Sequence, residues 1–144
     1  MTRPTRRQLL AALAAVPAAF AASAPARPTL CLFSKHLPWM GYAEMAATLK
    51  RMGFAGVDLT VRPGGHVLPE NAARDLPLAH DALAAEGFAL PMITTGLTSI
   101  DDPAARPTLY TAARLGVPFF KLGYYRYRDP AELEATLAQV KRQV

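Results

Sequence analysis

The strongest constraint on the fold is a repeat of about thirty residues in which a short apolar strand precedes a helix. The strand candidates span Leu30–Ser34, Val57–Val61, Phe88–Thr95 and Pro118–Gly123. Their short apolar runs, bounded by turn residues, are typical of buried strands. Strict alternation of strands and helices predicts an α/β protein with a parallel sheet covered by helices.

The first three helices are predicted to end at glycines, and in the first of them Met45, Leu49 and Met52 fall on one face at helical spacing. They span Tyr42–Met52, Leu76–Glu86 and Ala105–Leu115, and a glycine that can adopt a positive φ follows each of them. Asp75 is the expected N-cap of the second helix.

The fourth helix has a stronger start signal. Asp129 is its expected N-cap, Pro130 occupies the first helical position, and Glu132 stands at the third, as in a capping box. We expect this helix to continue to Val144.

Two architectures contain such units, the doubly wound open sheet and the (β/α)8 barrel, also called the TIM barrel. A Gly-x-Gly-x-x-Gly motif, the main pointer to a dinucleotide-binding sheet, does not follow the first strand. All four strands end in polar residues, and barrels build their sites at the carboxyl ends of strands. The sequence therefore predicts about four βα repeats, a half barrel, over residues 27–144.

Residues 1–26 are expected to be a separate unit, a twin-arginine signal peptide. Arg6 and Arg7 precede an uncharged, alanine-rich run from Leu9 to Ala22, and two A-x-A cleavage sites follow. The run is short for a membrane span and contains Pro17. We therefore expect a periplasmic or secreted protein that meets a membrane only during export.

Removal of the signal also changes the charge of the protein. The whole chain has 16 basic and 11 acidic residues, and loss of three signal arginines leaves 13 against 11, a net charge of +2. So small a charge argues against nucleic acid as a partner. Cys31 is the only cysteine, so no intramolecular disulfide can form, and its apolar neighbours predict a small core residue.

The strand ends carry cations, hydroxyl groups and aromatic rings. They include the threonines 94, 95 and 98 at the end of the third strand, and Tyr125 and Arg126 after the fourth. Rings can pack on the CH face of a sugar while cations and hydroxyls bind its oxygens, so we predict a sugar or sugar phosphate ligand. The candidate substrate-binding residues are Lys35, His36, Trp39, Arg62, His66, Lys121 and Tyr124.

Asp58 is the one carboxylate in this group. Side chains alternate between the two faces of a strand, so Asp58 and Thr60 would face the barrel lumen if Val57 and Leu59 face the helices. Lys121 can face the lumen from the fourth strand. An Asp58–Lys121 ion pair is therefore a hypothesis, with either a structural or a catalytic role.

The chain resembles the sugar phosphate isomerases/epimerases of the xylose isomerase-like TIM barrel superfamily. The resemblance rests on residues 33–37 (FSKHL) and 53–66 (GFAGVDLTVRPGGH), and it extends over residues 29–144. It implies ketose–aldose isomerisation or epimerisation, with a divalent metal (Mn, Mg, Zn or Co) that polarises oxygens while carboxylates move a proton.

The resemblance covers only the N-terminal half of such a barrel. The family's metal ligands come from the second half, so none can be assigned to this chain. His66 alone matches a family position, that of a substrate-contacting histidine.

We therefore expect an inactive fragment that lacks the metal-binding half, because the chain stops inside a predicted helix after four units. A homodimer of half barrels is the rival arrangement. A non-catalytic carbohydrate-binding barrel is the alternative function. A nuclease of the endonuclease IV type is disfavoured, because it needs a zinc-binding cluster and only three histidines are present.

The export signal gives the first testable prediction. Replacement of both Arg6 and Arg7 by lysine should block export, because the twin-arginine pathway reads the arginine pair itself. Fractionation of cells into periplasm and cytoplasm measures the result. Unchanged export of the double variant would contradict the assignment.

Overall fold

The structure is a computed structural model that describes residues 30–141. The predicted signal peptide, residues 1–26, and the predicted continuation of the last helix over residues 142–144 lie outside this range. No helix within 30–141 is long and apolar enough to span a membrane.

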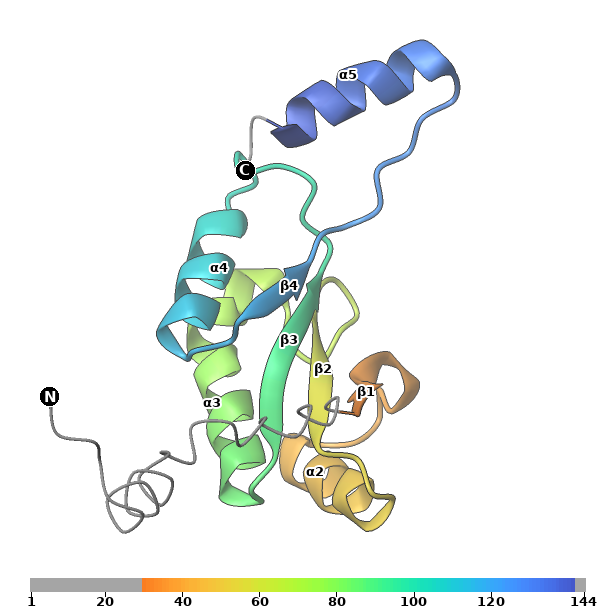
Figure 1. Cartoon of the computed structure of the whole chain (residues 1–144). Helices are drawn as coiled ribbons and strands as arrows, with labels where there is room; N and C mark the ends of the chain where they lie inside the picture. Colours follow the sequence, from red (N-terminus) through yellow and green to blue (C-terminus); the bar gives the residue numbers. More distant parts are fainter. Residues whose placement is uncertain (1–29, 142–144) are drawn as a thin grey trace, which may run out of the picture.

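Four parallel strands form one sheet in the order β1-β2-β3-β4 (Figure 1). They span Cys31–Phe33, Gly56–Val61, Ala89–Thr95 and Phe119–Lys121. Strands that are neighbours in the chain are also neighbours in the sheet, so the strand order shows none of the reversal of a doubly wound sheet. The predicted α/β class is confirmed, and the sheet is compatible with half of a βα barrel.

Three helices, α2 (Tyr42–Arg51), α3 (Ala72–Ala85) and α4 (Ala105–Arg114), connect the strands and form a layer in which α3 contacts both α2 and α4. The glycines expected to end them, at positions 53, 87 and 116, all have positive φ, between 70° and 85°. Beyond each glycine a backbone N–H bonds to the carbonyl five residues back, as in a Schellman motif. These bonds are Phe54 to Leu49, Phe88 to Leu83 and Val117 to Ala112.

The predicted start of α3 is wrong. The helix begins at Ala72, and Asp75 lies inside it, paired with Arg74 instead of capping the first turn. The cause is a 3₁₀ turn, η2 (Pro69–Asn71), which starts at a proline and runs directly into the helix. Because Pro69 already fixes a helical φ, the chain enters the helix earlier than the sequence pattern suggests.

The core lies between the sheet and this helix layer. Val57, Leu59 and Val61 of β2 and Ile93 of β3 are at most 1% exposed. They belong to one apolar cluster with buried residues of the three helices, among them Met45, Leu49, Leu76, Leu83 and Ala112. Asp58 and Thr60 of β2 and Thr94 of β3 alternate with these apolar residues and lie on the opposite face of the sheet.

The last strand and helix are less buried. Phe119 and Phe120 of β4 are 65% and 47% exposed. Helix α5 (Pro130–Lys141) has no buried residue and lies apart from the α2–α4 layer (Figure 1). The end of the chain that the structure describes therefore stands outside the main core.

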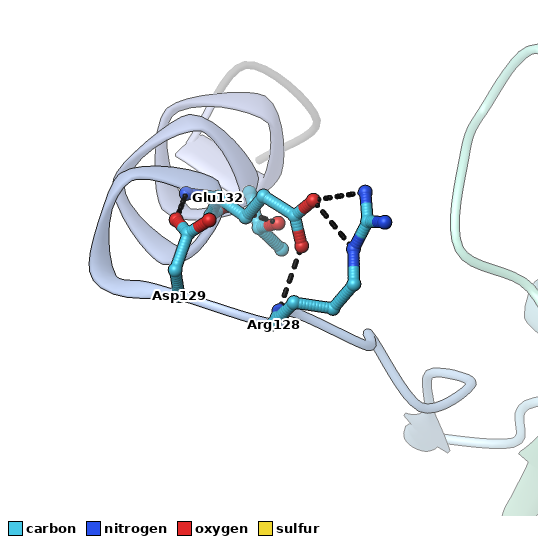
Figure 2. Close-up of polar contacts among 4 residues, drawn as sticks. Arg128, Asp129 and Glu132 are labelled. Atoms are coloured by element: carbon cyan, nitrogen blue, oxygen red, sulfur yellow. Dashed lines mark hydrogen bonds and ion pairs between the residues drawn. The ribbon is translucent and has the colours of Figure 1, made fainter.

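The predicted cap of α5 is confirmed. Figure 2 shows the Glu132 backbone N–H donating to Asp129 Oδ1, 2.9 Å away. The Glu132 carboxylate accepts hydrogen bonds from the Arg128 backbone N–H at 2.7 Å and from its guanidinium. The side chain of Glu132, the third helical residue, thus accepts from Arg128, the residue before the N-cap Asp129.

The burial pattern predicts different costs for two leucine substitutions. Leu59→Ala in β2 should lower the free energy of unfolding by about 3 kcal/mol, because it opens a cavity in the core. Leu78→Ala, at a residue that is 59% exposed in α3, should change it by less than about 0.5 kcal/mol. Urea denaturation measures both, and equal costs would contradict the described packing.

Candidate functional site

A cavity of about 310 Å³ opens where charged side chains from several strands and strand ends converge. Its lining residues are Phe33, Lys35, Asp58, Arg62, Thr94, Thr95, Gly96, Lys121, Gly123 and Tyr124. Larger hollows of about 400 to 450 Å³ lie among the helices and loops, but they are lined mainly by proline and apolar side chains. We therefore take the charged cavity as the candidate site, because convergent polar groups mark binding sites.

Asp58 and Thr94 form the floor of the cavity, since both lie within strands. The Thr94 hydroxyl lies 2.8 Å and 2.9 Å from the two carboxylate oxygens of Asp58. Burial raises the pKa of Asp58, and the bond from Thr94 and the charge of Lys121 partly oppose this. One hydroxyl proton cannot saturate two oxygens, so the carboxylate keeps acceptor capacity for a ligand.

Lys121 does not form the hypothesised ion pair with Asp58. The ion pairs within residues 30–141 are Arg74–Asp75, His80–Asp81 and Arg128–Glu132. The Lys121 ammonium instead donates to the Leu122 carbonyl at 3.2 Å and stands 3.9 Å from the centre of the Tyr124 ring. The Tyr124 ring and the Leu122 carbonyl therefore bind the Lys121 ammonium, and the Thr94 hydroxyl donates to the Asp58 carboxylate.

Arg62 and Lys35 line the cavity just beyond the ends of β2 and β1, and we call this side of the cavity the rim. Lys35 is exposed and Arg62 is half-buried. The Arg62 guanidinium lies 5.8 Å from the centre of the Phe33 ring. Its Nε atom is buried and has no hydrogen-bond partner. With Lys121, these residues place three cations against one carboxylate, so the cavity lining has a formal charge of +2.

The backbone forms another wall. A Cβ atom on Gly123 would stand 2.4 Å from the Gly96 carbonyl oxygen, which is far inside a van der Waals contact. The Gly123 N–H donates to the Leu97 carbonyl at 2.7 Å. Glycine is therefore required where the segments that follow β3 and β4 meet.

His66 is not among the lining residues, because its ring faces the segment that follows β1. Nε2 lies 3.0 Å from the Leu37 carbonyl, which can only accept, so Nε2 carries a proton. Nδ1 lies 3.2 Å from Thr60 Oγ1, and this hydroxyl also accepts from the His66 backbone N–H. Both ring nitrogens are therefore engaged in joining the segment after β2 to the segment after β1.

His66 lies against the segment that follows β1 because the chain after β2 folds back on that strand. Gly64 has a φ of 68°, and the Gly65 N–H bonds to the Arg62 carbonyl. The Val67 N–H then bonds to the Thr60 carbonyl at 3.1 Å. The same turn leaves Arg62 at the cavity and moves His66 away from it.

The remaining predicted residues lie outside the lining. His36 is exposed and meets the Phe33 ring edge-on with 6.0 Å between ring centroids. Trp39 is 71% exposed in the loop before α2. Tyr125 Oη donates to the Thr98 carbonyl at 2.9 Å, and Arg126 is exposed. Of the seven candidate substrate-binding residues, the cavity brings together Lys35, Arg62, Lys121 and Tyr124.

Sequence reasoning missed Phe33, Gly96 and Gly123 as parts of the site. Phe33 pairs with Asp58 across β1 and β2, so strand alternation alone could have placed it on the same face. The approach of the two glycines depends on how the segments after β3 and β4 meet, and no sequence pattern records it. Cys31 is half-buried, in contrast to the predicted core position, and burial and the Asp58 charge raise its pKa.

The described residues do not fit the divalent metal that the resemblance implies. Within residues 30–141 no three His, Cys, Asp or Glu side chains come close enough to hold an ion. Asp58 is bonded to Thr94, and both nitrogens of His66 are engaged. We therefore derive no chemical step through a metal.

No protein-family model and no curated protein matches this chain. Functional inference therefore rests on the cavity and on the residues that carry the resemblance.

The hydroxyl at the centre of the His66 contacts gives a stability prediction. Thr60→Val should lower the free energy of unfolding by about 1 to 3 kcal/mol, because it leaves the His66 N–H and Ser34 Oγ without their shared partner. Thr60→Ser keeps the hydroxyl and should stay closer to wild type. Urea denaturation measures both variants, and a valine variant as stable as the serine variant would refute this role.

Proposed function

We propose that the charged cavity binds a sugar or sugar phosphate, and that the chain supplies the N-terminal βα units of a sugar phosphate isomerase/epimerase-like barrel of the xylose isomerase-like superfamily. The observation that carries the proposal is the convergence of Lys35, Arg62, Lys121 and Tyr124 around the Asp58–Thr94 floor. Sites of βα barrels lie at the carboxyl ends of their strands, where these residues are found.

The residue types suit a polyhydroxylated ligand. Lysine and arginine donate to hydroxyl, carbonyl or phosphate oxygens, and the Asp58 carboxylate accepts from sugar hydroxyls. Tyr124 is 78% exposed and offers ring surface beside Lys121. Together these groups can hold a sugar by its oxygens and by an apolar face.

Isomerisation and epimerisation of sugars transfer a proton between carbon and a base. Asp58 is the carboxylate among the cavity-lining residues. Desolvation raises its pKa above the ordinary carboxyl value, the direction in which a carboxylate becomes a stronger proton acceptor. Lys121 supplies a positive charge on the same side of the sheet, where oxyanion character would develop on a sugar carbonyl.

A non-catalytic carbohydrate-binding barrel is the second candidate. It needs only the cavity and its sugar-binding side chains. An endonuclease IV-type nuclease needs a zinc-binding cluster, and residues 30–141 hold none. The twin-arginine pattern supports export of either protein, to the periplasm or out of the cell.

Sugar binding is the test of the proposal. Calorimetric titration of the purified protein with glucose 6-phosphate and fructose 6-phosphate should show binding, and Lys121→Met should weaken it about tenfold, the cost of one charge-assisted hydrogen bond. Lys141→Met removes an exposed lysine at the end of α5 and should leave the affinity unchanged.

Absence of binding by every sugar and sugar phosphate tried would overturn the proposal. Conversion between the ketose and the aldose, followed by NMR, separates the two candidates. Binding with no conversion favours the carbohydrate-binding barrel.

A further inference from the structure

Arg62 is a cation without a matching acceptor. Its Nε atom is buried and makes no hydrogen bond. Within residues 30–141 the contact made by its guanidinium is with the Phe33 ring, which offers an apolar face and no acceptor oxygen. Buried donors in folded proteins almost always have a partner, so an orphaned guanidinium N–H at a cavity indicates an acceptor that arrives with a ligand.

The surrounding charges restrict the ligand further. Lys35 and Lys121 line the same cavity, and Asp58 is the carboxylate that offsets them. The net charge of +2 is neutralised by a dianion. A phosphate monoester carries nearly two negative charges at pH 7, whereas a sugar carboxylate or sulfate ester carries one.

The three cations of the cavity also differ in the contacts that they already make with other protein groups. Lys121 donates to the Leu122 carbonyl and lies against Tyr124. Arg62 and Lys35 lie just beyond the ends of β2 and β1, Lys35 is exposed, and the planar fork of Arg62 matches phosphate oxygens. Asp58 and Thr94 lie within the strands.

We propose that Arg62 and Lys35 bind the phosphate group of a phosphorylated sugar at the rim, with the sugar hydroxyls directed to Asp58 and Thr94. This assignment rests on the proposed function, which it narrows from sugars in general to sugar phosphates. The inorganic phosphate ion alone should also occupy the rim, with lower affinity.

The experiment compares ligands that differ only in the terminal group. Wild-type protein is titrated calorimetrically with glucose, glucuronate, glucose 6-sulfate, glucose 6-phosphate and inorganic phosphate. We expect glucose 6-phosphate to bind at least tenfold more tightly than the singly charged sulfate ester and glucuronate, and these more tightly than glucose.

Arg62→Met should remove that preference and leave the affinity for glucose within twofold of wild type. Its melting temperature should change little, because the guanidinium has no protein acceptor to lose and gives up only its contact with the Phe33 ring. Arg114→Met, at an exposed arginine that ends α4, is the matched control and should retain the preference. Lys35→Met tests the second rim cation independently and should lose part of the preference.

The outcomes are distinct. Equal affinity for glucose and glucose 6-phosphate overturns the phosphate assignment and leaves sugar binding intact. Glucuronate that binds as tightly as glucose 6-phosphate overturns the requirement for a dianion. Inorganic phosphate binding that depends on Arg62, with no sugar phosphate bound, supports the anion site and removes the proposed function. Absence of binding by every ligand overturns both.

Discussion

The register of β2 against β3 determines which side chains of these two central strands face the cavity. Leu59 is opposite Ile93, and Thr60 is opposite Thr94. One face of each strand thus meets the helix layer while the next residue meets the cavity. A slip of one residue would bring Asp58 into the apolar cluster and Leu59 into the cavity. Because burial of Leu59 and Ile93 makes such a slip unfavourable, the apolar core holds the charged site in place from the other side of the sheet.

The βα order could be read from the sequence because apolar spacing and stop glycines are local signals, and the three repeated glycine caps confirm them. The residues at which the strands and helices begin and end could not be read from the sequence in the same way. The first strand was expected to include Ser34, but Ser34 begins a 3₁₀ turn, η1 (Ser34–His36), and its side chain accepts the Thr60 backbone N–H. The Thr60 N–H thus bonds to a side chain 26 residues away instead of to a backbone carbonyl of the neighbouring strand. The local sequence pattern around Ser34 does not predict such a bond.

The location of the site was accessible from the sequence for a similar reason, since parallel strands present all their carboxyl ends at one edge of the sheet. That rule suffices for Lys35, Arg62, Lys121 and Tyr124, which follow the strands closely or belong to them. It fails for His66, whose position depends on a backbone turn folding back on Thr60. Alternation also indicates the face on which Asp58 and Lys121 lie, but not their rotamers, which the Thr94 hydroxyl and the Tyr124 ring decide.

The contact between Gly96 and Gly123 has a consequence for how such a cavity can diversify. A Cβ atom on Gly123 would stand 2.4 Å from the Gly96 carbonyl oxygen, so position 123 accepts no side chain unless the backbone moves. A Cβ atom on Gly96 would meet only ordinary contacts, with Arg62 and Pro63 at 3.6 and 3.8 Å. New ligand preferences can therefore arise more readily elsewhere in the lining, at residues such as Lys35 and Arg62, than at Gly123. A directed-evolution library aimed at altered ligand range belongs at the ends of β1 and β2, while Gly123 is kept as a constant part of the scaffold.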